Sequence, residues 1–437
     1  MLPKAFNEGL MNFINASPTP FHATQTMSHA LLLAGFTPLY EEEIWHLQPG
    51  EKYFVCRNDS ALIAFTLGDL PLAETGIRMV GAHTDSPGLK IKPNFANERE
   101  GYKGLNVEVY GSPLLNPWFD RELSIAGRVH FRTHHGHVES CLIDIADPVA
   151  IIPSLAVHLD RNANNERSIN SQIHMIPVTG MVRGEGSRPQ GWFDFDEVLF
   201  LTAQQQNRNI ERILDAELFL YDHQQASIIG LNQEWLVSAR IDNLLSCYVG
   251  LMALIEAPAH QSNLLVCSDH EEVGSVSACG ANGRFLESIL NRLGLTSEDL
   301  ERTLAQSLFI STDNAHGVHP NYLDKHDAQH RPLINQGLVL KMNSNQRYAS
   351  TSETQALFRD LCHRLDVPVQ CFVSRNDMGC GSTIGPLVAA RLGVRTLDIG
   401  VPTLAMHSIR ELAGTVDAHY LYRALTGFFD DDDIPAS

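Results

Sequence analysis

Short, mainly apolar segments recur along the chain, and four of them run directly into acidic or histidine side chains. These segments span residues 77–87, 263–275, 307–320 and 394–411. Apolar runs of this length are typical of parallel strands that are buried on both faces. A fifth segment, residues 238–251, places one aspartate at the start of an apolar helical run. Because ligands in open α/β sheets bind beyond the carboxyl ends of the strands, we expect the five segments to meet at one edge of a sheet.

The pattern changes in the middle of the chain. Residues 53–57 and 61–67 predict a β-hairpin. Residues from about 92 to 230 alternate apolar and polar side chains, as antiparallel strands with one buried face do. We therefore expect an α/β fold with a mixed, largely parallel sheet and flanking helices. It is formed by residues 1–91 and 231–437 and is interrupted by a β-rich insertion domain at residues 92–230.

Charge and cysteine content narrow the possible partners and compartment. The formal net charge is −19, from 32 basic and 51 acidic residues, and such a field disfavours nucleic acid and anionic membranes as partners. Polar residues interrupt residues 1–21, so we expect no secretory signal peptide there. The eight cysteines include no CxxC pair, which fits a reduced, cytoplasmic compartment.

The ends of the five segments supply more hard ligands than one metal ion uses, and about as many as two ions need. Zinc is the leading metal for such carboxylates and imidazoles, and cobalt or manganese can replace it. Two such ions lower the pKa of a bridging water towards about 7 and polarise a scissile carbonyl. The candidate residues are His83, Asp85, Asp242, Glu271, Glu272, Asp313 and His407.

Glu271 and Glu272 are adjacent and follow a strand, so their side chains point in different directions. One carboxylate can bind metal while its neighbour takes a proton from water. The spacing does not decide which glutamate has which role. An exposed acidic turn is the alternative for an isolated Glu-Glu pair.

Each remaining candidate also has an ordinary structural interpretation. Asp242 is placed to bridge two cations or to cap a helix. His83 and Asp85 suit a metal-binding histidine oriented by a carboxylate, or a turn capped by an aspartate. Asp313 suits an Asx-turn, and His407 suits a structural histidine. Their joint placement at strand ends is what favours a metal site.

Seven motifs together resemble those of the aspartyl aminopeptidase family, zinc exopeptidases that remove acidic N-terminal residues. The resemblance covers essentially the whole chain, and it implies a zinc exopeptidase type of α/β fold. The motifs are GAHTDSP (81–87), RIDN (240–243), SDHEEVGS (268–275), TDNAHGVHPNY (312–322), NSNQRYAS (343–350), GCGSTIGP (379–386) with the preceding Asn376-Asp377, and AMHSIRE (405–411).

The resemblance implies roles for the candidate residues. Glu271 is the general base, Asp85 supports a metal-bound histidine, and the Asp242–Asn243 peptide bond is cis. Two zinc ions per subunit are implied, with Asp242 bridging them. The implied ligands are His83, Asp242, Glu272, Asp313 and His407.

The family also marks the histidine of LAVHLDR, here His158, which lies in the insertion. The resemblance implies that this histidine reaches the substrate of a partner subunit and that the insertion is a dimerisation domain. Dimers would then build a larger homo-oligomer, a dodecameric shell. A structural histidine on an alternating strand is the other interpretation of His158.

Acidic substrates require local positive charge in a chain of this net charge. Lys341 and Arg347 are the candidates, because their segment follows an apolar strand and lies among the site motifs. A partly desolvated ammonium near a substrate carboxylate supplies several kcal/mol. This chain has Met378-Gly379-Cys380-Gly381 where several eukaryotic relatives have Thr/Ser-Pro-Cys-Gly, a difference that affects the expected pocket wall.

The leading hypothesis is a zinc metallo-aminopeptidase that acts on peptides with a free N-terminus and prefers acidic residues. Two alternatives remain open at this point. The first is a dinuclear zinc amidohydrolase of the deacetylase or carboxypeptidase kind. The second is a non-catalytic, metal-stabilised shell protein, which requires Glu271 to be dispensable.

Overall fold

The four apolar segments become neighbouring parallel strands. A computed structural model describes residues 3–182, 195–258 and 260–431. In it the strands lie in the order β13 (Asn263–Ser268), β4 (Arg78–His83), β14 (Leu308–Thr312) and β18 (Arg395–Gly400). Each neighbouring pair is parallel, which confirms the predicted parallel segments. Their carboxyl ends therefore lie at one edge of the sheet.

Further strands extend this sheet on both sides. β2 (Lys52–Arg57) and β3 (Ala61–Thr66) form the predicted hairpin, and β3 pairs antiparallel with β13. The other side continues from β18 to β16 (Leu338–Met342) and then β17 (Val369–Val373). Within the described residues the sheet has nine strands, including β1 (Thr37–Pro38) at its edge. The mixed, largely parallel α/β sheet is confirmed.

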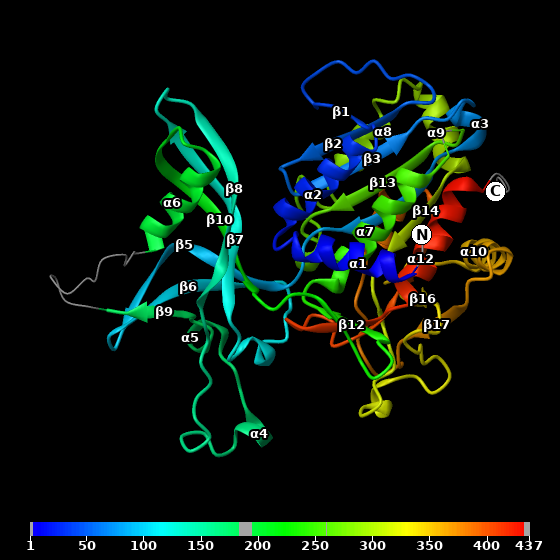
Figure 1. Cartoon of the computed structure of the whole chain (residues 1–437). Helices are drawn as coiled ribbons and strands as arrows, with labels where there is room; N and C mark the ends of the chain where they lie inside the picture. The colour runs from blue at the N-terminus through cyan, green and yellow to red at the C-terminus, as the bar shows by residue number, and fades with distance from the viewer. Residues whose placement is uncertain (1–2, 183–194, 259, 432–437) are drawn as a thin grey trace. The chain divides into compact units, whose positions relative to one another are not determined.

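Helices cover both faces of this sheet because its strands are apolar on both faces (Figure 1). On β14, Leu308 and Ile310 belong to one core and Phe309 to the other, as the two-residue period of a strand requires. The first core also contains residues from α1 (Pro3–Asn15), α2 (Pro20–Leu33), α7 (Ile241–Glu256), α10 (Ser352–Arg364) and α12 (Asp417–Asp430). The second contains residues from α3 (Leu72–Thr75), α8 (Phe285–Leu290), α9 (Ser297–Gln306) and α11 (Ile384–Leu392).

A small second sheet, which was not predicted from the sequence, is formed by five short strands between residues 227 and 414. Its strands are two to four residues long, too short to show a periodic pattern. Four of them lie at site motifs: one ends shortly before RIDN, one lies within TDNAHGVHPNY, one ends directly before AMHSIRE, and one begins on the last residue of AMHSIRE. In order across the sheet they are β11 (Ser227–Ile229), β12 (Trp235–Ser238), β20 (Glu411–Gly414), β19 (Pro402–Leu404) and β15 (Ala315–His316).

The middle of the chain forms an antiparallel sheet, as its alternating pattern predicts. The helix α6 (Phe195–Gln206) packs on it through Leu199 and Ala203, and α4 (Ala163–Glu166) and α5 (Ser171–His174) are single turns. Residues 183–194 of the predicted insertion lie outside the described residues. The described strands are, in order, β8 (Val138–Ala150), β7 (Leu123–Thr133), β10 (Ile210–Asp222), β5 (Gly88–Arg99), β6 (Tyr102–Tyr110) and β9 (Val178–Met181).

Contacts divide the chain into two units. The core unit comprises Met1–Ser86, Ala226–Met406 and Glu411–Ser437, and the insertion unit comprises Pro87–Gln225 and His407–Arg410. The segment His407–Arg410 is distant in sequence from the rest of the insertion unit but packs with it. The pattern of apolar and polar residues along the chain does not reveal such a tertiary contact. Among the described helices, none is long and apolar enough to cross a membrane.

Candidate metal centre

His83 lies at the end of β4 and is almost fully buried. Its Nε2 atom is 3.5 Å from Oδ1 of Asp242 and 3.7 Å from Oδ1 of Asp313. Asp242 belongs to the first turn of α7, and Asp313 directly follows β14. Three segments that are distant in sequence therefore converge on one imidazole, because two of them end neighbouring parallel strands.

Asp85 connects this imidazole to the two glutamates. Its carboxylate lies 3.4 Å from Nδ1 of His83 and is fully buried. Oδ1 accepts the backbone N–H of Glu271 and Oδ2 accepts that of Glu272, each at 3.1 Å. Nδ1 of His83 also lies 3.0 Å from the backbone carbonyl oxygen of Asp85. Asp85 thus orients the histidine ring through its carbonyl and its carboxylate, and its carboxylate also holds the start of the loop that carries the Glu271–Glu272 pair.

The structure distinguishes the two adjacent glutamates. Both lie in the single turn η2 (Glu271–Val273) after β13. Glu272 forms a group with His83 and Asp242 in which the ligand atoms all lie within 4.8 Å of one another. Glu271 is not a member of that group. The grouping agrees with Glu272 as the ligand and Glu271 as the base, an assignment that remains a prediction.

Burial and mutual repulsion shift the pKa values of both glutamates. Burial, opposed by His83 and reinforced by the carboxylates of Asp313, Asp85 and Asp242, raises the pKa of Glu271 to about 8. Burial and then the charge of Asp242 raise the pKa of Glu272 well above its usual value. The loop therefore holds two carboxyl groups that are reluctant to ionise without a nearby cation.

The histidine has the complementary shift. Burial alone would lower the pKa of His83, but the carboxylates of Asp242, Asp313 and Asp85 outweigh it and raise the pKa well above its usual value. For Asp313, burial is outweighed by the ammonium of Lys341 and by His83, so its pKa is lowered. Positive charge is thus strongly favoured at this point of the structure.

This donor set fits zinc. Carboxylates outnumber the cationic groups His83 and Lys341, and the ligands of a tetrahedral zinc ion lie roughly 3.3–3.5 Å apart. The separations of 3.5 and 3.7 Å between His83 Nε2 and the two aspartates are close to that spacing. The set offers imidazole nitrogen and carboxylate oxygen, both of which zinc accepts.

Asp242 is held by neighbours that sequence reasoning did not identify. The peptide bond Asp242–Asn243 is cis, as the resemblance implied. The backbone N–H of Asp242 donates to Oε2 of Glu411 at 2.9 Å, and Ser86 Oγ donates to the Asp242 carbonyl at 2.6 Å. Glu411 is buried and ends the motif AMHSIRE, so its presence in that motif was the available signal.

Lys341 is buried rather than solvated. It lies on β16, its Nζ atom is 3.5 Å from Oδ2 of Asp313, and it lies 5.4 Å from the centre of the Tyr348 ring. Arg347, the second cation proposed from the sequence, is exposed on the loop after β16. Lys341 thus contacts Asp313, which lies beside His83, whereas Arg347 is exposed.

Two further candidates, His407 and His158, belong to the insertion unit. His407 has a positive φ of 65°, and its Nδ1 atom lies 3.1 Å from the carbonyl oxygen of Ser112. His158 is exposed on the connection between β8 and α4. The roles of both histidines remain predictions.

Known proteins resemble this chain over nearly its whole length. Residues 13–429 match the family described as aminopeptidase I zinc metalloprotease (M18). A probable M18 family aminopeptidase 2 of Ectopseudomonas mendocina (strain ymp) is 53% identical over 429 residues, which cover 98% of this chain and 99% of the relative. The protein of the same description from Pseudomonas fluorescens (strain SBW25) is 53% identical over 433 residues, with 99% and 100% covered.

Solved structures share the fold. A chain from the cryo-EM structure of the Ape4 and Nbr1 complex has a TM-score of 0.92 at 37% identity, covering 98% of this chain and 86% of that one. The mApe1 dodecamer of S. cerevisiae has a TM-score of 0.82 at 28% identity, covering 98% and 96%. Since the family match spans the described metal centre, this chain belongs to the M18 family of aminopeptidases, which are zinc metalloproteases.

Proposed function

We propose that this aminopeptidase uses two zinc ions to remove acidic residues from the free N-terminus of peptides. The observation that carries the proposal is the convergence of His83, Asp242, Glu272 and Asp313, with Asp85 orienting both His83 and the glutamates. The proposed ligands are these four residues and His407, with Asp242 shared by the two ions. Cobalt or manganese is expected to replace zinc. When bound, the zinc pair supplies Lewis-acid activation of a water molecule and of the scissile carbonyl.

Glu271 is the proposed general base and acid. Its carboxylate accepts a proton from the attacking water, and the resulting carboxyl group then donates that proton to the leaving amine. The backbone N–H of Glu271 donates to Asp85, which holds the backbone from which this side chain extends. A cation beside it would favour the ionised form that a base requires.

The proposed source of the acidic preference is Lys341, with the exposed Arg347 as a second contributor. Lys341 is buried, so its ammonium acts in a medium of low dielectric constant, where an ion pair is stronger than in water. Its neighbour Tyr348 belongs to a small buried cluster against which Cys380 packs. Cys380 and Met378 line a cavity of about 290 Å³ in the core unit. This cavity is where we place the substrate side chain.

The replacement Lys341→Met tests this preference. We expect kcat/KM for an Asp-peptide to fall about 10- to 100-fold more than kcat/KM for a Leu-peptide, corresponding to roughly 1.4–2.8 kcal/mol of selective binding. The ratio is the readout, because loss of the pair with Asp313 lowers both rates. Arg347→Met is the exposed control and is expected to change the ratio less. If the ratio of kcat/KM for the Asp-peptide to that for the Leu-peptide is unchanged in Lys341→Met, Lys341 pairs only with Asp313 and does not select the substrate.

The proposed reaction is tested with three peptides that differ only at the N-terminus: free Asp, free Leu and N-acetyl-Asp. The zinc-loaded enzyme is expected to release free aspartate fastest, leucine more slowly, and nothing from the blocked peptide. Cleavage of the blocked peptide alone would instead indicate the amidohydrolase or deacetylase reaction. Absence of turnover on all three would favour a non-catalytic shell protein.

We also propose that the chain forms a homo-oligomer built from dimers through the insertion unit, and that the final assembly is a dodecameric shell. The M18 relative mApe1 is a dodecamer. On this chain, Leu155, Val157 and Leu159 flank His158 and are 57%, 55% and 75% exposed. Three apolar side chains this exposed on one connection are expected to be covered by a second copy.

Mixing two inactive variants tests whether His158 acts across subunits. In a heterodimer of His158→Ala and Glu271→Gln, one of the two sites combines an intact Glu271 with an intact His158 from its partner. Random exchange at equal amounts should therefore restore about a quarter of wild-type activity. No restoration, with exchange verified by mass spectrometry, would mean that His158 serves its own subunit.

A further inference from the structure

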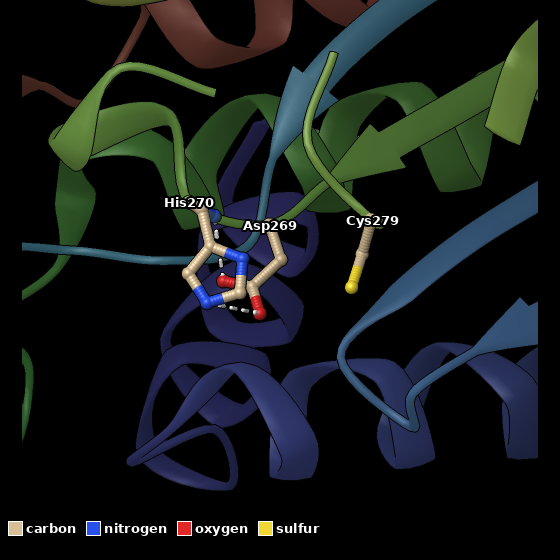
Figure 2. A group of neighbouring side chains, drawn as sticks. All are labelled: Asp269, His270 and Cys279. Carbon is tan, nitrogen blue, oxygen red and sulfur yellow. Dashed lines mark hydrogen bonds and ion pairs between the residues drawn. The ribbon is translucent and has the colours of Figure 1, made fainter. Parts of the chain in front are cut away.

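A second group of potential metal ligands lies at the base of the loop that follows β13. The group consists of Asp269, His270 and Cys279, whose ligand atoms all lie within 4.8 Å of one another. Figure 2 shows the three side chains extending from the loop in the same direction. Asp269 and Cys279 are each only 4% exposed, whereas His270 is partly accessible to solvent. None of the three is among the ligands assigned above.

The backbone of the loop brings these residues together. The N–H of Asp269 donates to the carbonyl of Cys279 at 3.2 Å, and the N–H of Ser275 donates to that of His270 at 2.7 Å. His270 has a positive φ of 62°, a conformation that is unusual for a residue other than glycine, asparagine or aspartate. In this conformation a ring nitrogen of His270 lies within 4.8 Å of the ligand atoms of Asp269 and Cys279.

The histidine ring is oriented as in known metal sites. Its Nδ1 atom lies 2.9 Å from Oγ of Ser277, which also accepts the N–H of Gly280 at 2.9 Å. Its Nε2 atom lies 3.5 Å from Oδ2 of Asp269. Metal-binding histidines are usually held by such a hydrogen bond on the ring nitrogen that does not bind the metal.

Charge and donor chemistry both favour a cation here. The Asp269 carboxyl is buried near the buried Asp85, and these two effects raise its pKa to about 6. One thiolate, one imidazole and one carboxylate form a donor set that zinc prefers. Zinc ligands lie roughly 3.3–3.8 Å apart, so small side-chain movements suffice to bind an ion. The His270 side chain is 32% exposed, so solvent reaches this group and a water can serve as fourth ligand.

We propose that Asp269, His270 and Cys279 bind one further zinc ion per chain, separate from the proposed pair. This ion fixes the two ends of the loop, whose first turn contains Glu271 and Glu272. The site is structural: it touches neither substrate nor reacting atoms, and it holds the loop in the conformation that the catalytic glutamates need.

Cobalt(II) distinguishes this site from the catalytic pair, because only this site has a sulfur ligand. Metal-free protein is titrated with cobalt, and the near-ultraviolet thiolate-to-cobalt charge-transfer band is recorded. We expect the band in the wild type and in His83→Ala, which disables the catalytic pair, and its loss in Cys279→Ser. Cys362→Ser is the control, since Cys362 is an equally buried thiol on α10 and should leave the band unchanged.

Zinc content provides the second readout. Cys279→Ser and His270→Gln are each expected to contain one zinc ion fewer per chain than the wild type and to retain part of their aminopeptidase activity. A cobalt-loaded wild type without a charge-transfer band would overturn the proposal. A band that persists in Cys279→Ser would also overturn it, because the sulfur ligand would then be another cysteine, such as Cys247 beside the His83 carbonyl. If the band is present in the wild type but lost in His83→Ala, the thiolate site depends on the catalytic pair, and the two sites are not separate.

Discussion

Replacing Glu271 by glutamine is expected to lower kcat by about 10²- to 10⁴-fold, the usual contribution of a general acid–base group. Glutamine keeps the size of the side chain and leaves the backbone N–H that donates to Asp85. It cannot accept the proton of the attacking water. Zinc content should therefore stay at the wild-type level, and KM should change little. Steady-state kinetics and metal analysis on the same preparation measure both.

The adjacent residue supplies the matched control. Glu272→Gln removes a proposed ligand from the group with His83 and Asp242, so we expect it to lose zinc as well as activity. If Glu271→Gln loses zinc and Glu272→Gln retains it, the two roles are exchanged. Wild-type activity in Glu271→Gln would exclude it as the base.

Replacing His83 by alanine is expected to abolish detectable activity through loss of zinc. Its imidazole is the only neutral-donor ligand among the four assigned residues of the core unit, and its Nε2 atom faces both Asp242 and Asp313. Without it, three carboxylates remain to bind the metals, and repulsion among them opposes their ionisation. Zinc content after dialysis and kcat/KM with added zinc measure the effect.

A histidine far from this centre provides the comparison. His363 is exposed on α10, and His363→Ala should retain zinc and activity. Full zinc content in His83→Ala would show that the metals are held without it, and the ligand set would then have to be revised.

The residues at the ends of the parallel strands could be predicted because the apolar strand and the polar residues that follow it lie in one short segment of sequence. Residues 77–87 and 307–320 each contain a buried strand followed by candidate ligands, and parallel pairing brings the ends of the two strands together. The hairpin of β2 and β3 was equally predictable from its turn. The predicted and observed positions of strands and strand-end residues therefore agree where one segment contains both the apolar run and the polar residue.

Other features depend on contacts that no single segment encodes. Glu411 binds the backbone of Asp242 from 169 positions away, and Lys341 reaches Asp313 from a different strand. The sequence interpretation placed Lys341 towards substrate, and its burial against Asp313 appears only in three dimensions. The two glutamates likewise remain equivalent by spacing, and become different only when Glu272 is grouped with His83 and Asp242.

The central claim is that residues from five segments form one centre for two zinc ions. A zinc anomalous difference map from crystals of the full-length, zinc-loaded protein tests it directly. We expect two peaks beside Asp242, one on each side of its carboxylate, with His83, Glu272, Asp313 and His407 completing their coordination. A single peak at this centre, or peaks that leave Asp242 uncoordinated, would contradict the two-zinc account.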